Sequence, residues 1–246
     1  MSFLSAISDV FSRGNKLEEK KEKDRLSAYL YSLLLERVDL KDYENQSILS
    51  KYSVEVHNIT IACTVLSQAR SVNQLIDITG SEIERYPLKA LTVFLNELSE
   101  KAEAFDEVYK NKLLKKYREQ LFDTHHKIMI LKEKRKYSDY LSSPGKKSDD
   151  YWLMVLEACK KKACYEDPYS LYLHYLLAGF RMFALKEPGH VIGMPFPDGE
   201  VEKRGAGVFY CPAKDKGEKY QYSICSFCPA KIAESLLKKN QEKDSD

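Results

Sequence analysis

The sequence contains no long apolar run and no strong excess of charge of either sign. No stretch of the 246 residues approaches the ~18 consecutive apolar residues that a membrane-spanning helix needs, so we expect no transmembrane segment. The formal net charge is only +2, and basic runs such as residues 20–23 are interleaved with acidic residues. We therefore expect no nucleic-acid partner, because such partners are bound by concentrated positive charge.

Several sequence motifs of catalysis are also missing. There is no glycine-rich phosphate loop, no nucleophile elbow and no HExxH helix. No alternation of strand and helix patterns provides a thioredoxin-like setting for a Cys-x-x-Cys redox pair. The N-terminus lacks the basic start and the small-residue cleavage site of a secretory signal, so we expect a cytoplasmic protein. Whether the chain is an enzyme stays open at this level.

Helical periodicity is the main pattern that the sequence does contain. With 43% hydrophobic and 31% charged residues, the composition is ordinary for a soluble protein with a core. The longest helical pattern covers residues 106–137, and a short terminal helix is predicted over residues 229–239. Residues 79–81 predict the start of a helix, and residues 52–69 are compatible with either a helix or a strand. We expect a mainly α fold, a multi-helix bundle with a small C-terminal cysteine-rich β-hairpin subdomain that binds a metal.

A linker is predicted around Pro144, because Pro-Gly ends the long helical pattern there. It would divide the chain into an N-terminal helical region over residues 1–140 and a C-terminal helical region over residues 148–240. Residues 1–14 carry apolar side chains at helical spacing with few basic residues on the polar face. This pattern favours an amphipathic helix that contacts a protein partner or the core over one that lies on a membrane. The oligomeric state is left open.

The turn-rich segment of residues 188–231 holds three of the six cysteines and one histidine. Cys225 and Cys228 are separated by two residues, so one tight turn can bring both thiolates to a metal ion. A glycine-rich turn before Cys211 predicts a β-hairpin that brings this cysteine close, and His190 precedes the hairpin. We therefore predict a metal site made of His190 and the three cysteines.

Zinc is the metal that this predicted His/Cys₃ set suits best, because structural zinc sites are closed and four-coordinate. An iron–sulfur cluster stays open as an alternative, since thiolates hold both, and each of Cys211 and Cys228 precedes a proline, as is seen near clusters and in zinc knuckles. A disulfide between cysteines of this segment is a third alternative, and a reducing compartment disfavours it.

A second candidate site lies on the helix predicted over residues 168–187. His174 and Arg181 share a polar line on this otherwise apolar helix. A buried guanidinium needs a partner, because an unpaired buried charge is costly. The partner is either a carboxylate of the long helix, such as Glu119 or Asp123, or an anionic ligand held by His174 and Arg181.

Four short motifs of the C-terminal third resemble an uncharacterised archaeal family associated with methanogens, which is named by its domain of unknown function 2115. The motifs are Pro188-Gly189-His190, Gly193-Met194-Pro195-Phe196-Pro197-Asp198-Gly199, Phe209-Tyr210-Cys211-Pro212 and Cys225-Ser226-Phe227-Cys228-Pro229-Ala230-Lys231. The resemblance places the family's histidine at His190 and its three cysteines at Cys211, Cys225 and Cys228. It implies no activity, and it implies an anaerobic cytoplasm in which thiolates stay reduced.

Two functional hypotheses follow. In the first, the chain is a cytoplasmic metal-binding protein in which the His/Cys₃ site, with zinc, stabilises an interaction surface, while the N-terminal helix contacts a protein partner. In the second, the cysteines hold an iron–sulfur cluster or a metal with an open position, and His174 and Arg181 bind an anionic substrate beside it. Four filled ligand positions favour the first, because catalytic zinc keeps one position open.

Overall fold

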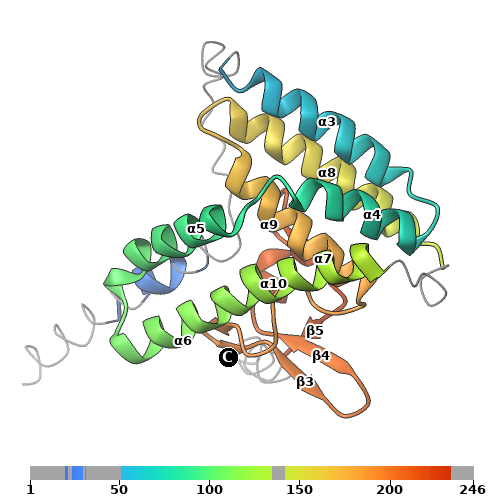
Figure 1. Ribbon diagram of the computed structural model, residues 1–246. Helices are drawn as coiled ribbons and strands as arrows, with labels where there is room; N and C mark the ends of the chain where they lie inside the picture. The colour runs from blue at the N-terminus through green and yellow to red at the C-terminus, as the bar shows by residue number, and fades with distance from the viewer. Residues whose placement is uncertain (1–19, 22–23, 30, 32–50, 135–141, 234–246) are drawn as a thin grey trace, which may run out of the picture.

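The computed structural model describes residues 20–21, 24–29, 31, 51–134 and 142–233. These residues form a mainly helical protein with a small C-terminal strand region, as predicted (Figure 1). The helices are α3 (Ser53–Ser67), α4 (Val72–Ile83), α5 (Leu88–Lys101), η1 (Ala102–Ala104), α6 (Glu107–Arg118), η2 (Glu119–Asp123), α7 (Thr124–Lys134), α8 (Lys146–Ala163), α9 (Tyr169–Gly179), η4 (Phe180–Ala184), α10 (Lys214–Gly217) and η5 (Ile224–Ser226). The strands are β1 (Pro195–Phe196), β2 (Gly199–Glu200), β3 (Glu202–Arg204), β4 (Val208–Cys211) and β5 (Lys231–Ile232).

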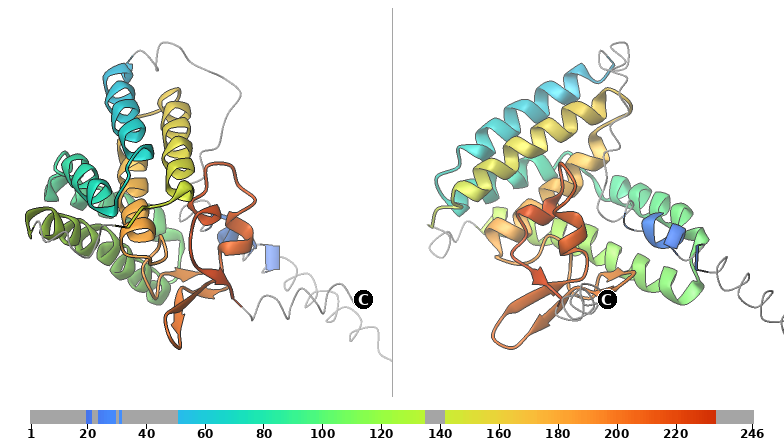
Figure 2. Two further views of the ribbon diagram at one scale, coloured as in Figure 1. Left: turned by 90° about the vertical axis from the view of Figure 1, so that its right-hand side faces the viewer. Right: turned by 180° about the vertical axis from the view of Figure 1, so that it is seen from behind.

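The helices surround α9, which is buried along its whole length apart from its first two residues (Figures 1 and 2). α3 and α8 lie side by side along one edge of the molecule, and α5 and α6 form a second pair that extends away from them. The strands β3, β4 and β5 lie at the opposite end from α3. The C-terminal segment, defined as residues 188–233, therefore covers one side of a helical core.

α3 forms a helix in the segment whose pattern was ambiguous. Its buried residues Ile59, Ala62, Cys63 and Leu66 recur at helical spacing and face α8. The two threonines of α3 are compatible with a helix, because each hydroxyl donates a hydrogen bond to the backbone carbonyl four residues earlier. The distance is 2.7 Å in both cases. Burial of one helical stripe thus outweighs the preference of β-branched residues for strands.

The helix start predicted at residues 79–81 is wrong. α4 begins at Val72, and the side chain of its N-cap residue, Ser71, accepts a hydrogen bond from the backbone N–H of Gln74. Gly80 lies within α4, and a Cβ at that position would stand 2.7 Å from Cδ of Lys132 in α7. The glycine thus permits close helix packing instead of marking a boundary.

The long helix predicted over residues 106–137 is present as far as Lys134, and residues 135–137 lie outside the described part. The side chain of Asp106 caps its start by accepting from the backbone N–H of Tyr109 at 2.9 Å. The helix is interrupted by η2, a π-helical turn, and η4 is a second such turn after α9. π-helical turns are rare in proteins, and those that occur are often located at functional sites.

The predicted β-hairpin is confirmed, whereas the terminal helix predicted from residue 229 does not start there. β3 pairs with β4 in antiparallel register, with Glu202 opposite Tyr210. Lys231 and Ile232 form the strand β5, which pairs with β4 in parallel and places Ile232 beside Cys211. Residues 234–239 of the predicted helix lie outside the described residues. Backbone pairing with β4 thus replaces the first turn of that helix.

Two tyrosines of the helical core fasten the C-terminal segment to α8 and α9. The ring of Tyr151 in α8 meets the ring of Phe227 edge to face, with centroids 5.3 Å apart. The hydroxyl of Tyr175 in α9 donates to the backbone carbonyl of Tyr222 at 2.7 Å. Seen from behind, the segment accordingly lies across α9 (Figure 2).

The two regions predicted on either side of Pro144 share one hydrophobic core. α3 packs on α8, and α4 packs on α9 and η4. The backbone N–H of Val72 also donates to the carbonyl of Ser142 at 2.9 Å, so the predicted linker is attached to the start of α4. The division of the chain into residues 1–140 and 148–240 as separate folding regions stays a prediction.

The described part of the N-terminal region contacts the C-terminal segment. The hydroxyl of Tyr31 donates to a carboxylate oxygen of Asp198 at 2.6 Å, and Lys216 pairs with the same oxygen. The amphipathic helix predicted over residues 1–14 lies outside the described residues. Nowhere in the described ranges does a helix combine the length and the apolar composition needed to cross a membrane.

Candidate functional site

The cysteine site, defined as Cys211, Cys225 and Cys228, is brought together by two elements. Cys211 ends β4, Cys225 lies in η5, and Cys228 follows within the same tight turn. All three are buried and carry free thiols. The turn is closed by the backbone N–H of Cys228, which donates to the carbonyl of Ile224 at 3.0 Å. Strand pairing between β4 and β5 holds Cys211 next to the chain that leaves this turn.

The buried environment of the cysteine site favours protonated thiols. Burial raises the pKa of Cys211, and the charges of Cys225 and Cys228 raise it further. Burial also raises the pKa of Cys225 to about 11, opposed by a hydrogen bond from the hydroxyl of Ser223. Cys211 and Cys225 are therefore held as neutral thiols, and a cation would have to displace their protons.

The ammonium group of Lys214 lies beneath the Cys225–Cys228 turn. Its Nζ donates to the backbone carbonyls of Cys225 and Cys228, at 3.0 Å in the second case. It also pairs with a carboxylate oxygen of Glu218 at 2.9 Å. Because α10 starts three residues after Cys211, this lysine ties the strand that carries one thiol to the turn that carries the other two.

The predicted ligands are not arranged as a finished metal site. Among the residues that the structure describes, no group of three or more histidine, cysteine, aspartate or glutamate side chains is placed so that it could hold a metal ion. His190 packs with its ring centroid 5.9 Å from that of His174 and 5.3 Å from that of Phe196. The three cysteines thus lie on adjacent elements without forming a finished metal site, and His190 packs among aromatic rings.

The backbone on both sides of His190 is held by residues of the two π-helical turns. Nε of Arg181 in η4 donates to the carbonyl of Pro188 at 2.9 Å. The side-chain oxygen of Gln120 in η2 accepts from the N–H of Val191 at 3.3 Å. Both side chains are buried, so the π-helical turns fix the position of His190 in the chain.

Arg181 pairs with a residue that the sequence pattern did not indicate. The predicted carboxylate partners Glu119 and Asp123 were wrong: a guanidinium nitrogen of Arg181 lies 3.0 Å from a carboxylate oxygen of Glu187. Glu119 pairs instead with Lys116 at 2.7 Å. Burial lowers the pKa of Arg181, and the Glu187 carboxylate opposes this effect. The ion pair satisfies Arg181 without an anionic ligand.

His174, the other residue of the predicted anion site, is held neutral. Burial lowers its pKa to about 3, and the nearby His190 lowers it in the same direction. A neutral imidazole attracts an anion far less than an imidazolium does. The geometry of His174 and Arg181 therefore gives no support to an anion site, although the prediction itself stays untested.

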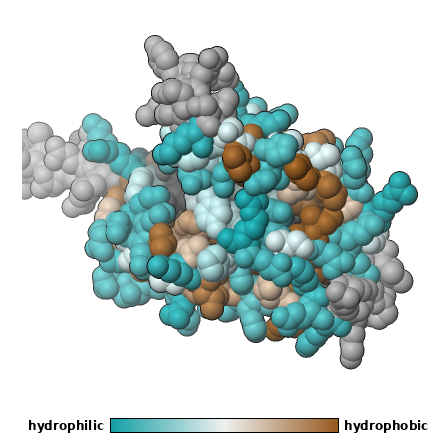
Figure 3. Space-filling model, turned by 45° about the horizontal axis from the view of Figure 1, so that its top comes forward, coloured by the Kyte–Doolittle hydropathy of each residue, from teal (hydrophilic) through white to brown (hydrophobic). Residues whose placement is uncertain are grey.

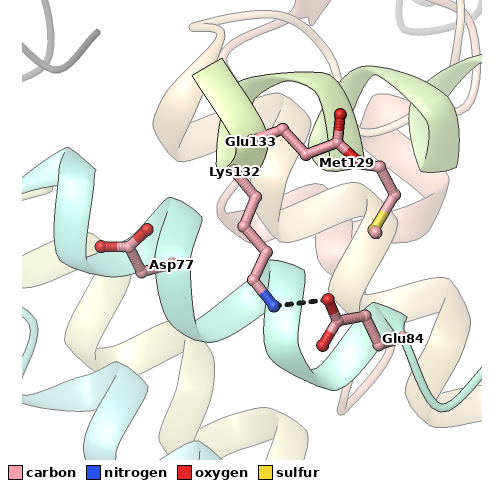
Figure 4. A pocket seen from close by; sticks show the side chains of 5 residues that line it. All are labelled: Asp77, Glu84, Met129, Lys132 and Glu133. Carbon is pink, nitrogen blue, oxygen red and sulfur yellow. Dashed lines mark ion pairs between the residues drawn. The ribbon is translucent and has the colours of Figure 1, made fainter. Parts of the chain in front are cut away.

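A small pocket between α4 and α7 was not anticipated from the sequence. It has a volume of about 320 Å³ and is lined by Asp77, Glu84, Met129, Lys132 and Glu133 (Figure 4). Lys132 points to Glu84 and pairs with it at 2.7 Å, while the carboxylate of Asp77 points away from this pair. The polar groups do not converge on a common point, so the pocket offers no arrangement for a specific ligand.

α3 also exposes apolar side chains on its outer face. Val54, Ile61 and Val65 are 65%, 53% and 46% exposed and follow one another at helical spacing. Brown side chains gather in the upper right of Figure 3, the view in which this end of the molecule comes forward. A groove of about 430 Å³ beside them is lined in part by Ile61, Val65 and Ile78.

Four residues that support the candidate site do not stand out in the sequence: Lys214, Ser223, Gln120 and Glu187. A lysine inside a cysteine-rich segment is the only signal that points to Lys214, and Lys216 and Lys219 carry the same signal. What distinguishes Lys214 is burial, which is a tertiary property.

Comparisons with known proteins place the chain among archaeal relatives. It is 31% identical over 81 residues to the UPF0305 protein MK0666 of Methanopyrus kandleri, a stretch that covers 33% of this chain and 57% of that protein. It is 44% identical over 46 residues and 45% identical over 53 residues to two UPF0305 proteins of Methanothermobacter thermautotrophicus, covering 19% and 21% of this chain. These stretches span 28% and 34% of the length of those two relatives.

No solved structure matches the chain. The sequence profile of an archaeal family described as "Uncharacterized protein conserved in archaea (DUF2115)" matches residues 71–232. The matched region takes in more than half of the chain and contains His190 and all three residues of the cysteine site. The chain therefore belongs to this archaeal family of domain of unknown function 2115.

Proposed function

We propose that this protein binds one thiophilic metal ion, zinc, through the thiolates of Cys211, Cys225 and Cys228. The observation that supports the proposal is the placement of these three buried thiols on β4 and on the turn that contains η5, which leads into the strand paired with β4. Soft thiolate ligands select zinc or iron–sulfur clusters over hard cations. The thiols would lose their protons as the ion binds, and small movements of the turn would bring the sulfur atoms to the metal.

His190 is proposed as the fourth ligand. Its ring packs against Phe196, and Phe196 in turn stacks on Tyr31, with ring centroids 6.0 Å apart. Burial and the bond to Asp198 raise the pKa of the Tyr31 hydroxyl, and the charge of Cys211 raises it further. A four-ligand site of this kind is structural, because it leaves no open position for a substrate.

A bound ion would stabilise the surface that the C-terminal segment forms over α8 and α9. It would add one more connection between β4 and the Cys225–Cys228 turn, next to the tyrosines that fasten the segment to the helices. The role is thus to hold an interaction surface in a cytoplasmic protein, since thiolates persist as metal ligands in reducing compartments.

The test is elemental analysis and visible absorption of full-length protein purified without oxygen. We expect about one zinc per chain in the wild type and loss of that zinc in Cys228→Ser. Cys164→Ser is the matched control, because Cys164 is a buried cysteine outside the site whose thiol donates to the Lys160 carbonyl. The control should keep its zinc. His190→Gln should bind zinc more weakly if the imidazole is a ligand.

Loss of zinc should also lower thermal stability, because binding energy of a structural site is folding energy. Each kcal/mol lost should shift the midpoint by about 2–4 °C for a chain of this size. If the protein instead contained iron and showed a broad charge-transfer band, its cofactor would be an iron–sulfur cluster and not zinc. Absence of both metals from the wild type would contradict the proposal.

A further inference from the structure

Lys214 is the one charged residue that is buried within the cysteine-rich part of the described chain, and its side chain is only 11% exposed. A buried ammonium is costly unless its protons are donated to acceptors. A lysine ammonium has three donors, and three acceptors surround this one: the carbonyls of Cys225 and Cys228 and the carboxylate of Glu218. Its hydrogen-bonding capacity is therefore filled by the protein itself.

The hydrogen bonds of Lys214 also give donors to two backbone carbonyls of the Cys225–Cys228 turn. The carbonyls of Cys225 and Cys228 each accept from Nζ of Lys214. Without the ammonium, the Cys228 carbonyl would lose this donor, whereas the Cys225 carbonyl would keep backbone donors such as the N–H of Cys228 at 3.3 Å. A buried carbonyl that loses its donor destabilises a fold, so the turn would open more readily. Because the two carbonyls belong to the residues that carry the thiols, the lysine fixes the separation of Cys225 and Cys228 through their backbone.

We propose that Lys214 is the positioning residue of the cysteine site, which keeps Cys225 and Cys228 together on one closed turn before an ion arrives. The inference rests on the proposed function, and it adds that the protein's own cation holds two of the three thiols in place. Residues that orient metal ligands without touching the metal tune its affinity. Here the hydrogen bonds run from the helix that follows Cys211 to the turn that holds the other two thiols.

The consequence for affinity follows from the population of the binding-competent turn. A ligand that binds one conformation has an apparent dissociation constant equal to the intrinsic constant divided by the fraction in that conformation. Lys214 raises that fraction, because it keeps Cys225 and Cys228 on one closed turn. Without it the turn opens, the fraction falls, and the apparent affinity falls in proportion.

The test is a competitive titration of Zn²⁺ and Co²⁺ into metal-free full-length protein against a chromophoric chelator. Lys214→Met should weaken metal binding by about 10–100-fold, the usual effect of removing a group that orients ligands. Lys219→Met is the matched control: it removes the same charge five residues away, from a side chain that is 69% exposed and pairs only with Asp215 among the described ion pairs. The control should bind like the wild type.

Two further readouts separate positioning from a general loss of structure. At saturation, Lys214→Met should show the same cobalt ligand-field and thiolate charge-transfer bands as the wild type, because its ligands are unchanged. In metal-free wild-type protein, the amides of Cys225 and Cys228 should be protected from hydrogen exchange, since they donate within the preformed turn. The second measurement needs no variant, so it holds even if Lys214→Met does not fold.

The outcomes distinguish this inference from the proposed function. If the wild type binds neither Zn²⁺ nor Co²⁺, the proposed metal site and the positioning role of Lys214 are both wrong. If the wild type binds and Lys214→Met binds with equal affinity, the positioning role is overturned and the metal site stands. Unprotected amides of Cys225 and Cys228 in metal-free wild-type protein would overturn it as well.

Discussion

At the scale of single residues, His125 shows how burial sets a charge state in this protein. It lies on the inner side of α7, where Nε2 is 3.0 Å from the backbone carbonyl of Tyr86. Burial lowers its pKa, and hydrogen bonds with the backbone of Tyr86 and Ile83 oppose that effect without cancelling it. The folded protein therefore holds this imidazole neutral at a pH where the unfolded chain would protonate it.

The free energy of unfolding should fall as the pH is lowered through the pKa of an unfolded histidine, about 6.5. Below that value the unfolded chain binds a proton that folded His125 does not, so acid favours unfolding; above it the contribution is fully present. His125→Gln should make chemical-denaturation stability less dependent on pH between about 8 and 5, and should cost about 1 kcal/mol at the upper end through the altered bond to Tyr86.

His57→Gln is the control for this measurement, because His57 is an exposed histidine on another helix, α3. Its stability curve should follow that of the wild type across the pH range. A His125→Gln protein with an unchanged pH dependence would show that other buried groups, such as His174, cause the acid sensitivity instead.

At the scale of secondary-structure elements, the close approach of α8 and α9 depends on Gly179. A Cβ at this position would stand 2.7 Å from Cη2 of Trp152 and 2.8 Å from Cε1 of Tyr151. Both rings are fully buried, and the hydroxyl of Tyr151 donates to the carbonyl of Tyr175 at 2.7 Å. The two rings have no room to move aside, so the helices would have to separate.

Gly179→Ala should therefore lower the free energy of unfolding by about 1–3 kcal/mol, even though alanine favours helix more than glycine does. Denaturant unfolding followed by circular dichroism measures this change. Ser170→Ala, at an exposed position of the same helix, should stay within about 0.5 kcal/mol of the wild type. A Gly179→Ala protein as stable as the wild type would show that the helices can shift apart at little cost.

At the scale of the whole molecule, the helices before and after Pro144 bury one common core. Its residues include Cys63 and Leu66 of α3 together with Val155 and Cys159 of α8. The C-terminal segment joins the same cluster through residues such as Met194 and the cysteine site. Shared burial of this kind couples the stability of both predicted regions.

We expect the chain to unfold in one cooperative transition. Trp152 is the only tryptophan of the sequence and is fully buried in α8, so its fluorescence reports on the C-terminal region. The circular dichroism signal reports on helices from both regions. The two transitions should coincide in urea, as two-state unfolding requires. A fluorescence change that precedes the loss of helix would support separate regions on either side of Pro144.

Local patterns in the sequence predicted a large part of this architecture. The mainly helical class and the hairpin of β3 and β4 follow from periodicity and turn residues, whereas the metal site of His190 and the three cysteines stays a prediction. Such signals act over a few residues, where backbone geometry leaves few alternatives. The order of residues alone was enough to select these cysteines as a candidate site.

Contacts between distant parts of the chain were decided by the tertiary structure. The pairing of Arg181 with Glu187, the strand β5 in place of a helical turn, and the burial of Lys214 between two cysteine carbonyls depend on which surfaces pack together. In each case the sequence offered several chemically equivalent partners, including neighbouring lysines and other carboxylates. Burial chose among them, because a charge or a backbone carbonyl removed from water must find the partner that packing places within reach.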